Sequence, residues 1–285
     1  MAKILLTGAT GFIGFNILEK IRDKNKVFII QRQNSKKKIK NSNNIKVLNF
    51  NNYNTLSKKL KKIKVDIIIH CATHYKKEHQ SKDIFKFIES NILFGNIILE
   101  NIKNLNAKKF INFSTTWENI NKKKHYPKNL YAAYKKGFNN IIDYYKNKLP
   151  EIKFYNLIIT DTFGNNDTRK KIINTLREKF NKNKISFIVS KNLYLNLLNV
   201  DDIVSAVKIF INNNIQPGQF VLKNSKYFNI YKLVKFINKN INKKMRIKWK
   251  SNKIIKDEIL NYKKLKSWKP KKSNINDIKK LILNK

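Results

Sequence analysis

The 285-residue sequence is poor in cysteine, glycine, proline and acidic residues. Its single cysteine, Cys71, excludes an intrachain disulfide framework and a zinc site built from several cysteines. No apolar run approaches the roughly 18 to 20 residues of a membrane span. The N-terminus has one lysine and then an apolar segment, which is not the layout of a signal peptide. We therefore expect a cytoplasmic protein without a membrane segment.

Negative charge is scarce, because 18 Asp and Glu residues face 62 Lys and Arg residues, for a formal net charge of +44. Clustered cations of this kind can neutralise nucleic-acid phosphates. Here the lysines are spread over the whole chain together with abundant Asn and Ile, and the densest runs, 36–38 and 122–124, lack interleaved aromatic residues. We interpret the charge as compositional bias and expect no nucleic-acid partner, although it should attract anionic ligands by long-range steering.

Three of the seven glycines lie in one short segment, residues 7–14, with the sequence Thr-Gly-Ala-Thr-Gly-Phe-Ile-Gly. An apolar run precedes it at 3–6, and apolar residues at helical spacing follow it at 15–21. A strand, a glycine turn and a helix place a pyrophosphate on a helix N-terminus. An ordinary turn between strand and helix is the alternative. We expect nucleotide contacts from Gly8, Thr10, Gly11, Phe12, Ile13 and Gly14.

The first half of the chain alternates short apolar runs with helical patterns. We predict strands at 27–30, 45–48, 66–70, 110–113 and 153–159, and helices at 56–63, 84–102 and 131–147. This alternation is typical of an α/β fold with a doubly wound parallel sheet. Further on we predict helices at 168–180, 200–212 and 230–241, and strands at 186–189, 218–222 and 245–249. We expect a domain at 1–164, to which the strand near 219–222 returns, and a smaller interwoven lobe at 165–285.

A second motif pairs Tyr131 with Lys135 at helical spacing, which puts both side chains on one helix face. A lysine ammonium near a phenol lowers the pKa of the phenol, which would make Tyr131 a usable acid or base. Upstream, the predicted strand at 110–113 ends in Ser-Thr-Thr, where a hydroxyl can meet a substrate oxygen. Each feature has an ordinary alternative, a chance Tyr-Lys spacing or a hydroxyl that caps a turn. Their order after the glycine turn favours a catalytic site.

These motifs resemble the extended short-chain dehydrogenases/reductases, the group of nucleotide-sugar epimerases, dehydratases and ketoreductases. The resemblance covers almost the whole chain. It also includes Asp-Ile-Ile-Ile-His-Cys-Ala at 66–72, Asn91, Asn-Val-Asp-Asp-Ile at 199–203 and Ser-Trp-Lys-Pro at 267–270. The resemblance implies a Rossmann domain with a small C-terminal lobe for a nucleotide sugar.

By the same resemblance, Tyr131 would be the acid/base and Lys135 would hold the nicotinamide ribose. Thr115 or Thr116 would supply the hydroxyl, and Asn91 would support the lysine through water, unless it is simply a polar residue on a helix face. Further expected cofactor contacts are Asn51, Cys71, Ala72 and Thr73. Expected substrate contacts are Thr116, Trp117, Arg169 and Asn199, although the basic segment at 168–171 can also be an exposed helix start.

Two departures from the family pattern narrow the chemistry. Trp117-Glu118-Asn119 stands where the family has Val-Tyr-Gly, which changes the expected substrate wall. Thr116-Trp117 stands where the dehydratases carry Asp-Glu, which argues against 4,6-dehydration. His74, His79 and His125 lack metal-ligand spacing, so we expect no metal. His70 is expected to be a core or cofactor-pocket residue and Cys71 a small buried hydrophobe.

The cofactor is predicted to be NADP rather than NAD. An NAD-selective site places an acidic residue after its second strand, whereas the segment 31–35 contains Arg32 and no carboxylate. Arg32 can pair with a 2′-phosphate, and the lysines at 36–38 add positive potential.

The predicted function is NADPH-dependent reduction of a nucleotide-linked 4-keto-deoxysugar. The segment 129–138 is similar to the 4-ketoreductases that make CDP-linked 3,6-dideoxyhexoses, the abequose and paratose synthases, which act in surface-polysaccharide sugar biosynthesis. An NAD-dependent epimerase and a non-enzymatic nucleotide-binding protein are the alternatives. The expected partner is the nucleotide-sugar substrate, and a homodimer is an assembly to be tested.

Overall fold

The computed structural model describes residues 1–239, 241–256 and 259–283. Its centre is an eight-stranded sheet in which every neighbouring pair is parallel. In spatial order the strands are β15 (Lys263–Lys264), β11 (Gly218–Leu222), β6 (Lys153–Ile159), β5 (Lys109–Thr115), β4 (Ile67–His70), β1 (Lys3–Thr7), β2 (Lys26–Arg32) and β3 (Ile45–Phe50). The predicted α/β class with a doubly wound parallel sheet is confirmed.

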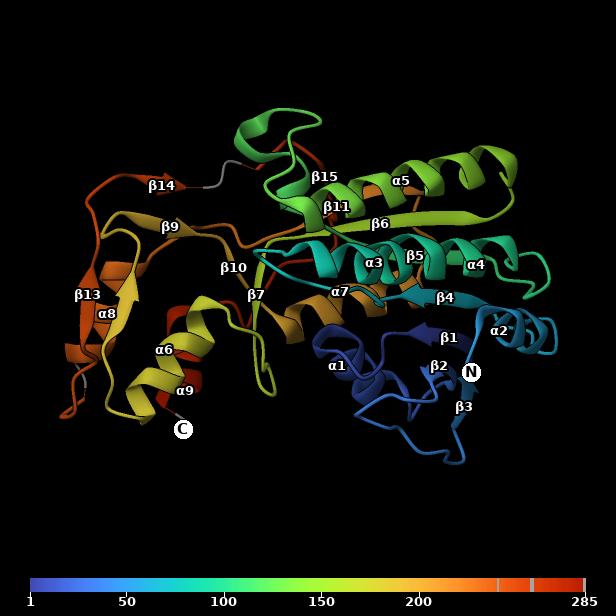
Figure 1. The fold of residues 1–285 in the computed structure, drawn as a ribbon, viewed down its shortest axis with the longest axis horizontal. Coiled ribbons are helices and arrows are strands. Elements are labelled where there is room, and N and C mark those ends of the chain that lie inside the picture. The colour runs from blue at the N-terminus through green and yellow to red at the C-terminus, as the bar shows by residue number, and fades with distance from the viewer. Residues whose placement is uncertain (240, 257–258, 284–285) are drawn as a thin grey trace.

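Helices cover both faces of this sheet (Figure 1). On one face, α1 (Phe12–Ile21) and α7 (Val200–Asn212) pack on Ile4 and Leu6. The other face carries α2 (Tyr53–Leu60), α4 (Phe94–Glu100) and α5 (Leu130–Lys148), which pack on Leu5 and its neighbours. Successive residues of a strand point to opposite faces, so one apolar run supplies both cores. Each fully buried aliphatic side chain contributes about 1.5–3 kcal/mol.

The small lobe at the other end of the molecule has its own apolar cluster (Figure 1). It packs around Leu233 and Ile278. Its helices are α6 (Ile172–Asn181), α8 (Ile230–Lys239) and α9 (Ile275–Leu283). Short strands join the lobe together: β7 (Asp161–Phe163) with β10 (Leu197–Asn199), β8 (Ser186–Ile188) with β13 (Ile247–Trp249), and β9 (Leu193–Leu195) with β12 (Phe228–Asn229) and β14 (Ile255–Lys256).

Two motifs of the C-terminal part meet in space. The indole N–H of Trp268 donates to the backbone oxygen of Asp202 at 3.1 Å and to the hydroxyl of Ser205 at 2.8 Å. The buried Asp202 carboxylate accepts hydrogen bonds from the backbone N–H groups of Lys271 and Lys272, at 2.7 to 3.0 Å, and from the Ser273 hydroxyl. The tail is thereby tied to α7, which lies on the main sheet.

The predicted helices differ from the observed ones at four places. The helix expected at 56–63 is α2, which begins at Tyr53 and ends at Leu60. The expected helix at 84–102 is α3 (Ile84–Ile88), a π-helical turn η2 (Glu89–Leu93) and α4. The expected helix at 168–180 begins only at Ile172, since Arg169 turns back to bond Asp167 and Thr162. The helix expected at 230–241 ends at Lys239, and residue 240 lies outside the described residues.

Short irregular elements complete the main part. They are the 3₁₀ turns η1 (Ser81–Asp83), η3 (Thr116–Glu118) and η4 (Ile120–Lys122). In the part of the chain that the structure describes, no helix is both long enough and apolar enough to cross a membrane.

Candidate active site

A cavity of about 1260 Å³ lies at the carboxyl ends of the parallel strands. The strand order reverses between β1 and β4, and open α/β sheets bind ligands in the crevice at such a point. Thirteen residues that the sequence predicts as functional line this cavity: Gly8, Thr10, Gly11, Phe12, Ile13, Gly14, Arg32, Cys71, Ala72, Thr73, Tyr131, Lys135 and Arg169. The remaining predicted residues Asn51, Asn91, Thr115, Thr116, Trp117 and Asn199 lie outside its lining.

The glycine turn forms a cradle that side chains would fill. Gly8 has a φ of 67°, and a Cβ there would lie 2.6 Å from the backbone nitrogen of Ala72. A Cβ on Gly14 would lie 2.2 Å from the backbone oxygen of Gly8. Gly11 is the N-cap of α1 and brings no side-chain cap, so the first helical N–H groups are open toward the cavity. This geometry suits a pyrophosphate, and the residues therefore fit a dinucleotide cofactor.

Positive charge dominates the wall of the cavity. Its lining contains Arg32, Lys37, Lys38, Lys135 and Arg169 and, among the described residues, no Asp or Glu. Within this wall, Arg32 at the end of β2 already has polar partners. Its guanidinium lies 3.1 Å from the carboxylate of Glu89 and donates to the Ser90 hydroxyl at 3.1 Å. The sequence argument did not find this carboxylate, because it comes from a segment far along the chain.

Tyr131 and Lys135 lie in the first turns of α5, and both line the cavity. Asn129 begins this helix, and its side chain accepts from the backbone N–H of Ala132 at 3.0 Å. Burial lowers the pKa of Lys135 to about 8, against the opposing effect of Glu118. Burial first and the Glu118 carboxylate second raise the pKa of Tyr131 well above its ordinary value.

That direction is opposite to the expectation from the sequence, in which Lys135 lowers the pKa of Tyr131. Desolvation by the surrounding protein, followed by the Glu118 carboxylate, outweighs the lowering effects of the Thr73 hydrogen bond and the Arg169 charge. In the protein alone the Tyr131 phenol is therefore neutral at pH 7, and it holds a proton.

The hydroxyl motif follows β5 into the turn η3. Ser114 lines the cavity. The Thr115 hydroxyl instead accepts from the backbone N–H of Trp117 at 3.3 Å and caps the turn, and Thr116 is buried beside it. Thr115 and Thr116 were the predicted hydroxyl residues, and Ser114 was not predicted. Successive side chains of a strand point to opposite faces, and this alternation separates Ser114 from Thr115.

A buried polar network stands behind Ser114. Its hydroxyl donates to the carboxylate of Glu118, which is 2% exposed. The Asn139 amide donates to that carboxylate at 2.7 Å and to the Ser114 hydroxyl at 3.0 Å. Asn112 donates in turn to Asn139 at 3.2 Å. Burial raises the pKa of Glu118, in opposition to these hydrogen bonds. Sequence reasoning noted Glu118 only as a nearby acid, since nothing local shows that it is buried.

Asn91 lies in the π-helical turn η2 and fixes the segment after β4. Its side-chain oxygen accepts from the Thr73 hydroxyl at 3.0 Å and from the backbone N–H of His74 at 2.6 Å. Its amide donates to the His74 backbone oxygen at 3.1 Å. The predicted support of Lys135 through water stays a prediction, but Asn91 does hold Thr73 in the cavity wall.

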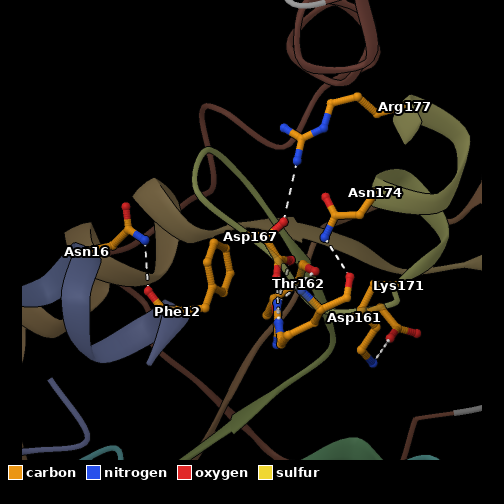
Figure 2. Close-up of polar contacts among 9 residues, drawn as sticks. Phe12, Asn16, Asp161, Thr162, Asp167, Lys171, Asn174 and Arg177 are labelled. Atoms are coloured by element: carbon orange, nitrogen blue, oxygen red, sulfur yellow. Dashed lines mark hydrogen bonds and ion pairs between the residues drawn. The ribbon is translucent and has the colours of Figure 1, made fainter. Parts of the chain in front are cut away.

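Aromatic rings pack around Tyr131 at the wall of the cavity. The ring of Tyr75 packs edge-on against Tyr131 with centroids 5.0 Å apart. The Lys171 ammonium lies 4.9 Å from the centroid of Tyr75 and 4.3 Å from that of Trp117. Asp161 pairs with Lys171 at 2.7 Å, as Figure 2 shows. Trp117 itself is buried, so Tyr75 rather than Trp117 lines the cavity.

Arg169 lies close to the start of α1. Its guanidinium stands 4.4 Å from the ring centroid of Phe12 and donates to Asp167 at 2.8 Å and to the Thr162 hydroxyl at 2.7 Å. Figure 2 labels Phe12, Thr162 and Asp167 around this side chain, and it shows Arg177 of α6 donating to the backbone oxygen of Asp167. Arg169 lines the cavity. Its predicted contact with a substrate diphosphate stays a prediction.

Two predicted contacts lie away from the main cavity. Asn51 is exposed directly after β3. Asn199 is the N-cap of α7, where its side chain accepts from the backbone N–H of Asp201 at 2.9 Å. It lines a separate cavity of about 530 Å³ together with Arg177 and Lys272. A substrate contact by Asn199 in the main cavity would need a rearrangement of this cap.

His70 and Cys71 end the strand β4 at the cavity. Burial, with the Lys135 charge second, lowers the pKa of His70 to about 3. Its Nδ1 lies 3.0 Å from the Thr7 hydroxyl. Burial also raises the pKa of the Cys71 thiol. Both side chains are therefore uncharged at pH 7.

Comparisons with known proteins now place the chain. A model of the NAD dependent epimerase/dehydratase family matches residues 4–222. A CDP-abequose synthase of Yersinia pseudotuberculosis is 27% identical over 76% of this chain and 75% of that protein. A second one, of Salmonella muenchen, is 24% identical over 90% and 87%. A dTDP-D-glucose 4,6-dehydratase of Dictyostelium discoideum is 33% identical over 73% of this chain and 55% of its own length.

Solved structures agree on the fold. The UDP-glucose 4-epimerase of Thermus thermophilus, in complex with NAD, has a TM-score of 0.81 and 16% identity over 98% of this chain and 97% of its own. The UDP-N-acetylglucosamine 4-epimerase of Methanobrevibacter ruminantium has a TM-score of 0.80 and 17% identity over 99% and 97%. At these identities the likeness shows the fold alone.

Proposed function

Because the chain belongs to the NAD dependent epimerase/dehydratase family, we propose that it reduces a nucleotide-linked 4-keto-deoxysugar with NADPH. The observation that carries this proposal is the position of Tyr131 and Lys135, which lie one turn apart on α5 and line the same cavity as the glycine turn. Reduction of a ketone creates an alkoxide that needs a proton, and a phenol that already holds one can deliver it.

The nicotinamide, when bound, supplies the hydride. The glycine cradle at α1 would hold the pyrophosphate, and Arg32 with Lys37 and Lys38 would face the adenosine ribose. Tyr131 would donate its proton to O4 of the sugar. We propose that a hydroxyl donates a hydrogen bond to the sugar carbonyl and orients it. This hydroxyl belongs to Thr115, to Thr116 or to Ser114, which lies in the cavity wall.

The substrate class rests on the relatives named CDP-abequose synthase and on the similarity of segment 129–138 to such 4-ketoreductases. A deoxysugar has fewer hydroxyls than a hexose and suits a less polar wall, which Tyr75 and the ring of Trp117 behind it would supply. The absence of Asp-Glu after Thr115 weighs against 4,6-dehydration, despite the relative of that name.

An epimerase is the second candidate, because solved structures of similar fold are nucleotide-sugar 4-epimerases. An epimerase must first remove a proton from the sugar hydroxyl. Measurement of net cofactor consumption separates this reaction from reduction.

The test is incubation with a CDP-4-keto-3,6-dideoxyhexose and NADPH, read as loss of absorbance. Steady loss supports the proposal. Loss only with another nucleotide-linked ketosugar would move the protein to a related ketoreductase. Interconversion of 4-epimers without net cofactor consumption would show that the protein is an epimerase. Binding of the dinucleotide without turnover would show that it is a nucleotide-binding protein.

The role of Tyr131 is tested by replacement with phenylalanine. Tyr131→Phe should lower kcat by about 10²- to 10⁴-fold, the usual value of a positioned acid, and leave the Kd of NADPH unchanged. Tyr134→Phe on the same helix, where the ring stacks on Phe87, is the matched control and should keep its activity. A Tyr131→Phe enzyme with more than about a tenth of normal activity would contradict the assignment.

A further inference from the structure

Arg32 is the cation best placed to recognise a 2′-phosphate, and the structure shows it already paired. Its side chain is 47% exposed, and Glu89 at 3.1 Å is 27% exposed. The neighbouring Ser90, which accepts a hydrogen bond from Arg32, lines the cavity, whereas Glu89 does not. The carboxylate therefore stands directly behind the cation rather than in the wall.

This carboxylate is held in place by its surroundings. Glu89 begins the π-helical turn that contains Asn91, and the hydrogen bonds of Asn91 to His74 anchor that turn. Tyr53 stands next to both charges, and burial together with the Glu89 carboxylate raises its pKa to about 12, so it stays neutral. Arg32 and Glu89 therefore form a direct ion pair, and Lys37 and Lys38 line the same cavity.

We propose that Glu89 is a specificity-determining residue that weakens the preference of this site for NADP over NAD. A 2′-phosphate must take Arg32 from Glu89 and must approach a second negative charge. NAD lacks this phosphate and has no such competition. If Arg32 is paired with Glu89 in most molecules, only the remaining fraction is ready to bind the phosphate. The apparent affinity for NADP⁺ is then reduced by that fraction. The inference uses only the nicotinamide cofactor of the proposed function, and no property of the sugar.

The test is calorimetric binding of NADP⁺ and NAD⁺ to the purified protein without substrate. Glu89→Gln keeps the shape of the side chain and removes its charge. It should tighten NADP⁺ about two- to fivefold, as expected for a partly exposed charge pair, and should change NAD⁺ less than about twofold. Glu178→Gln, which removes the carboxylate of an exposed pair with Lys182 on α6, is the matched control and should change neither affinity.

A double-mutant cycle separates the pair from general electrostatics. In an Arg32→Ala background, Glu89→Gln should tighten NADP⁺ less than it does when Arg32 is present, because only the direct repulsion between the carboxylate and the 2′-phosphate is then removed. The proposal would be overturned if Glu89→Gln improved the NADP⁺ affinity equally with and without Arg32. It would also be overturned if the affinities for NADP⁺ and NAD⁺ improved equally, or if NAD⁺ bound more weakly while the NADP⁺ affinity stayed constant. Circular dichroism melting of each variant checks the fold. If the unaltered protein bound neither dinucleotide, the proposed function itself would fail. If it bound both and Glu89→Gln changed neither, only this inference would fail.

Discussion

Lys135→Met should make the cofactor-free protein more stable while it removes catalysis. Lys135 is 3% exposed and, among the described residues, has no carboxylate within ion-pair distance. Its pKa of about 8 lies below the ordinary 10.5, because burial penalises the ammonium. A difference of this size corresponds to roughly 3 kcal/mol. Methionine fills similar space without a charge, so most of this amount should appear as added stability.

The sign of the pH dependence follows from the same values. Between about pH 8 and 10.5 the unfolded chain holds a proton on Lys135 that the folded protein has lost. The stability of the unaltered protein should therefore gain from Lys135 as the pH rises through this window. The advantage of Lys135→Met should be full, about 2–3 kcal/mol, at pH 7 and below. It should shrink through pH 8 and vanish above pH 10.5.

Urea unfolding followed by circular dichroism, at pH 7 and at pH 10, measures this difference. Lys146→Met on the exposed face of α5 is the control, and it should be close to neutral at both pH values. Saturating NADP⁺ should stabilise the unaltered protein more than the variant, since Lys135 would then have ribose contacts. The reasoning is refuted if Lys135→Met is less stable at pH 7, or if its advantage does not change with pH.

Two further predictions concern the frame of the site. Gly8→Ala should abolish calorimetric NADP⁺ binding and lower Tm, because the added Cβ would meet the Ala72 backbone at 2.6 Å and φ is 67°. Unchanged binding would mean that the turn adapts. Asp202→Asn should cost about 2–4 kcal/mol in urea unfolding, because its carboxylate accepts from two backbone N–H groups at 271–272. Asp201→Asn, on the same turn and exposed, should cost little, and equal costs would contradict the argument.

The sheet and its order of elements could be predicted because their signals are local. Runs such as 66–70 and 153–159 are short, apolar and bounded by turn residues, which is typical of buried parallel strands. The glycine turn was equally clear, since Gly8 and Gly14 occupy positions where a side chain would collide with backbone. The short strands β7, β9, β10, β12, β14 and β15 were not predicted. Each has two or three residues, too few for a period to show.

The electrostatics of the site could not be predicted, because they depend on residues distant in sequence and on burial. The partner of Arg32 is Glu89, and the pair joins β2 to the helical segment that follows β4 in the chain. The partner of Lys171 is Asp161, brought beside it by a turn of the chain. Spacing suggested that Lys135 lowers the pKa of Tyr131. The sequence does not show how deeply both groups are buried, and burial decides the direction.

In a chain with so few carboxylates, the position of each one carries information. The cavity wall is cationic, and in the part of the chain that the structure describes three carboxylates pair with residues of the wall without lining it themselves: Glu89 with Arg32, Asp167 with Arg169 and Glu118 with Ser114. Glu118 favours the charged form of Lys135 and raises the pKa of Tyr131, so one buried carboxylate acts on both groups. A carboxylate in the wall itself would repel the phosphates of a dinucleotide. One placed behind the wall can instead adjust the charge of a neighbouring cation or the proton of a neighbouring phenol.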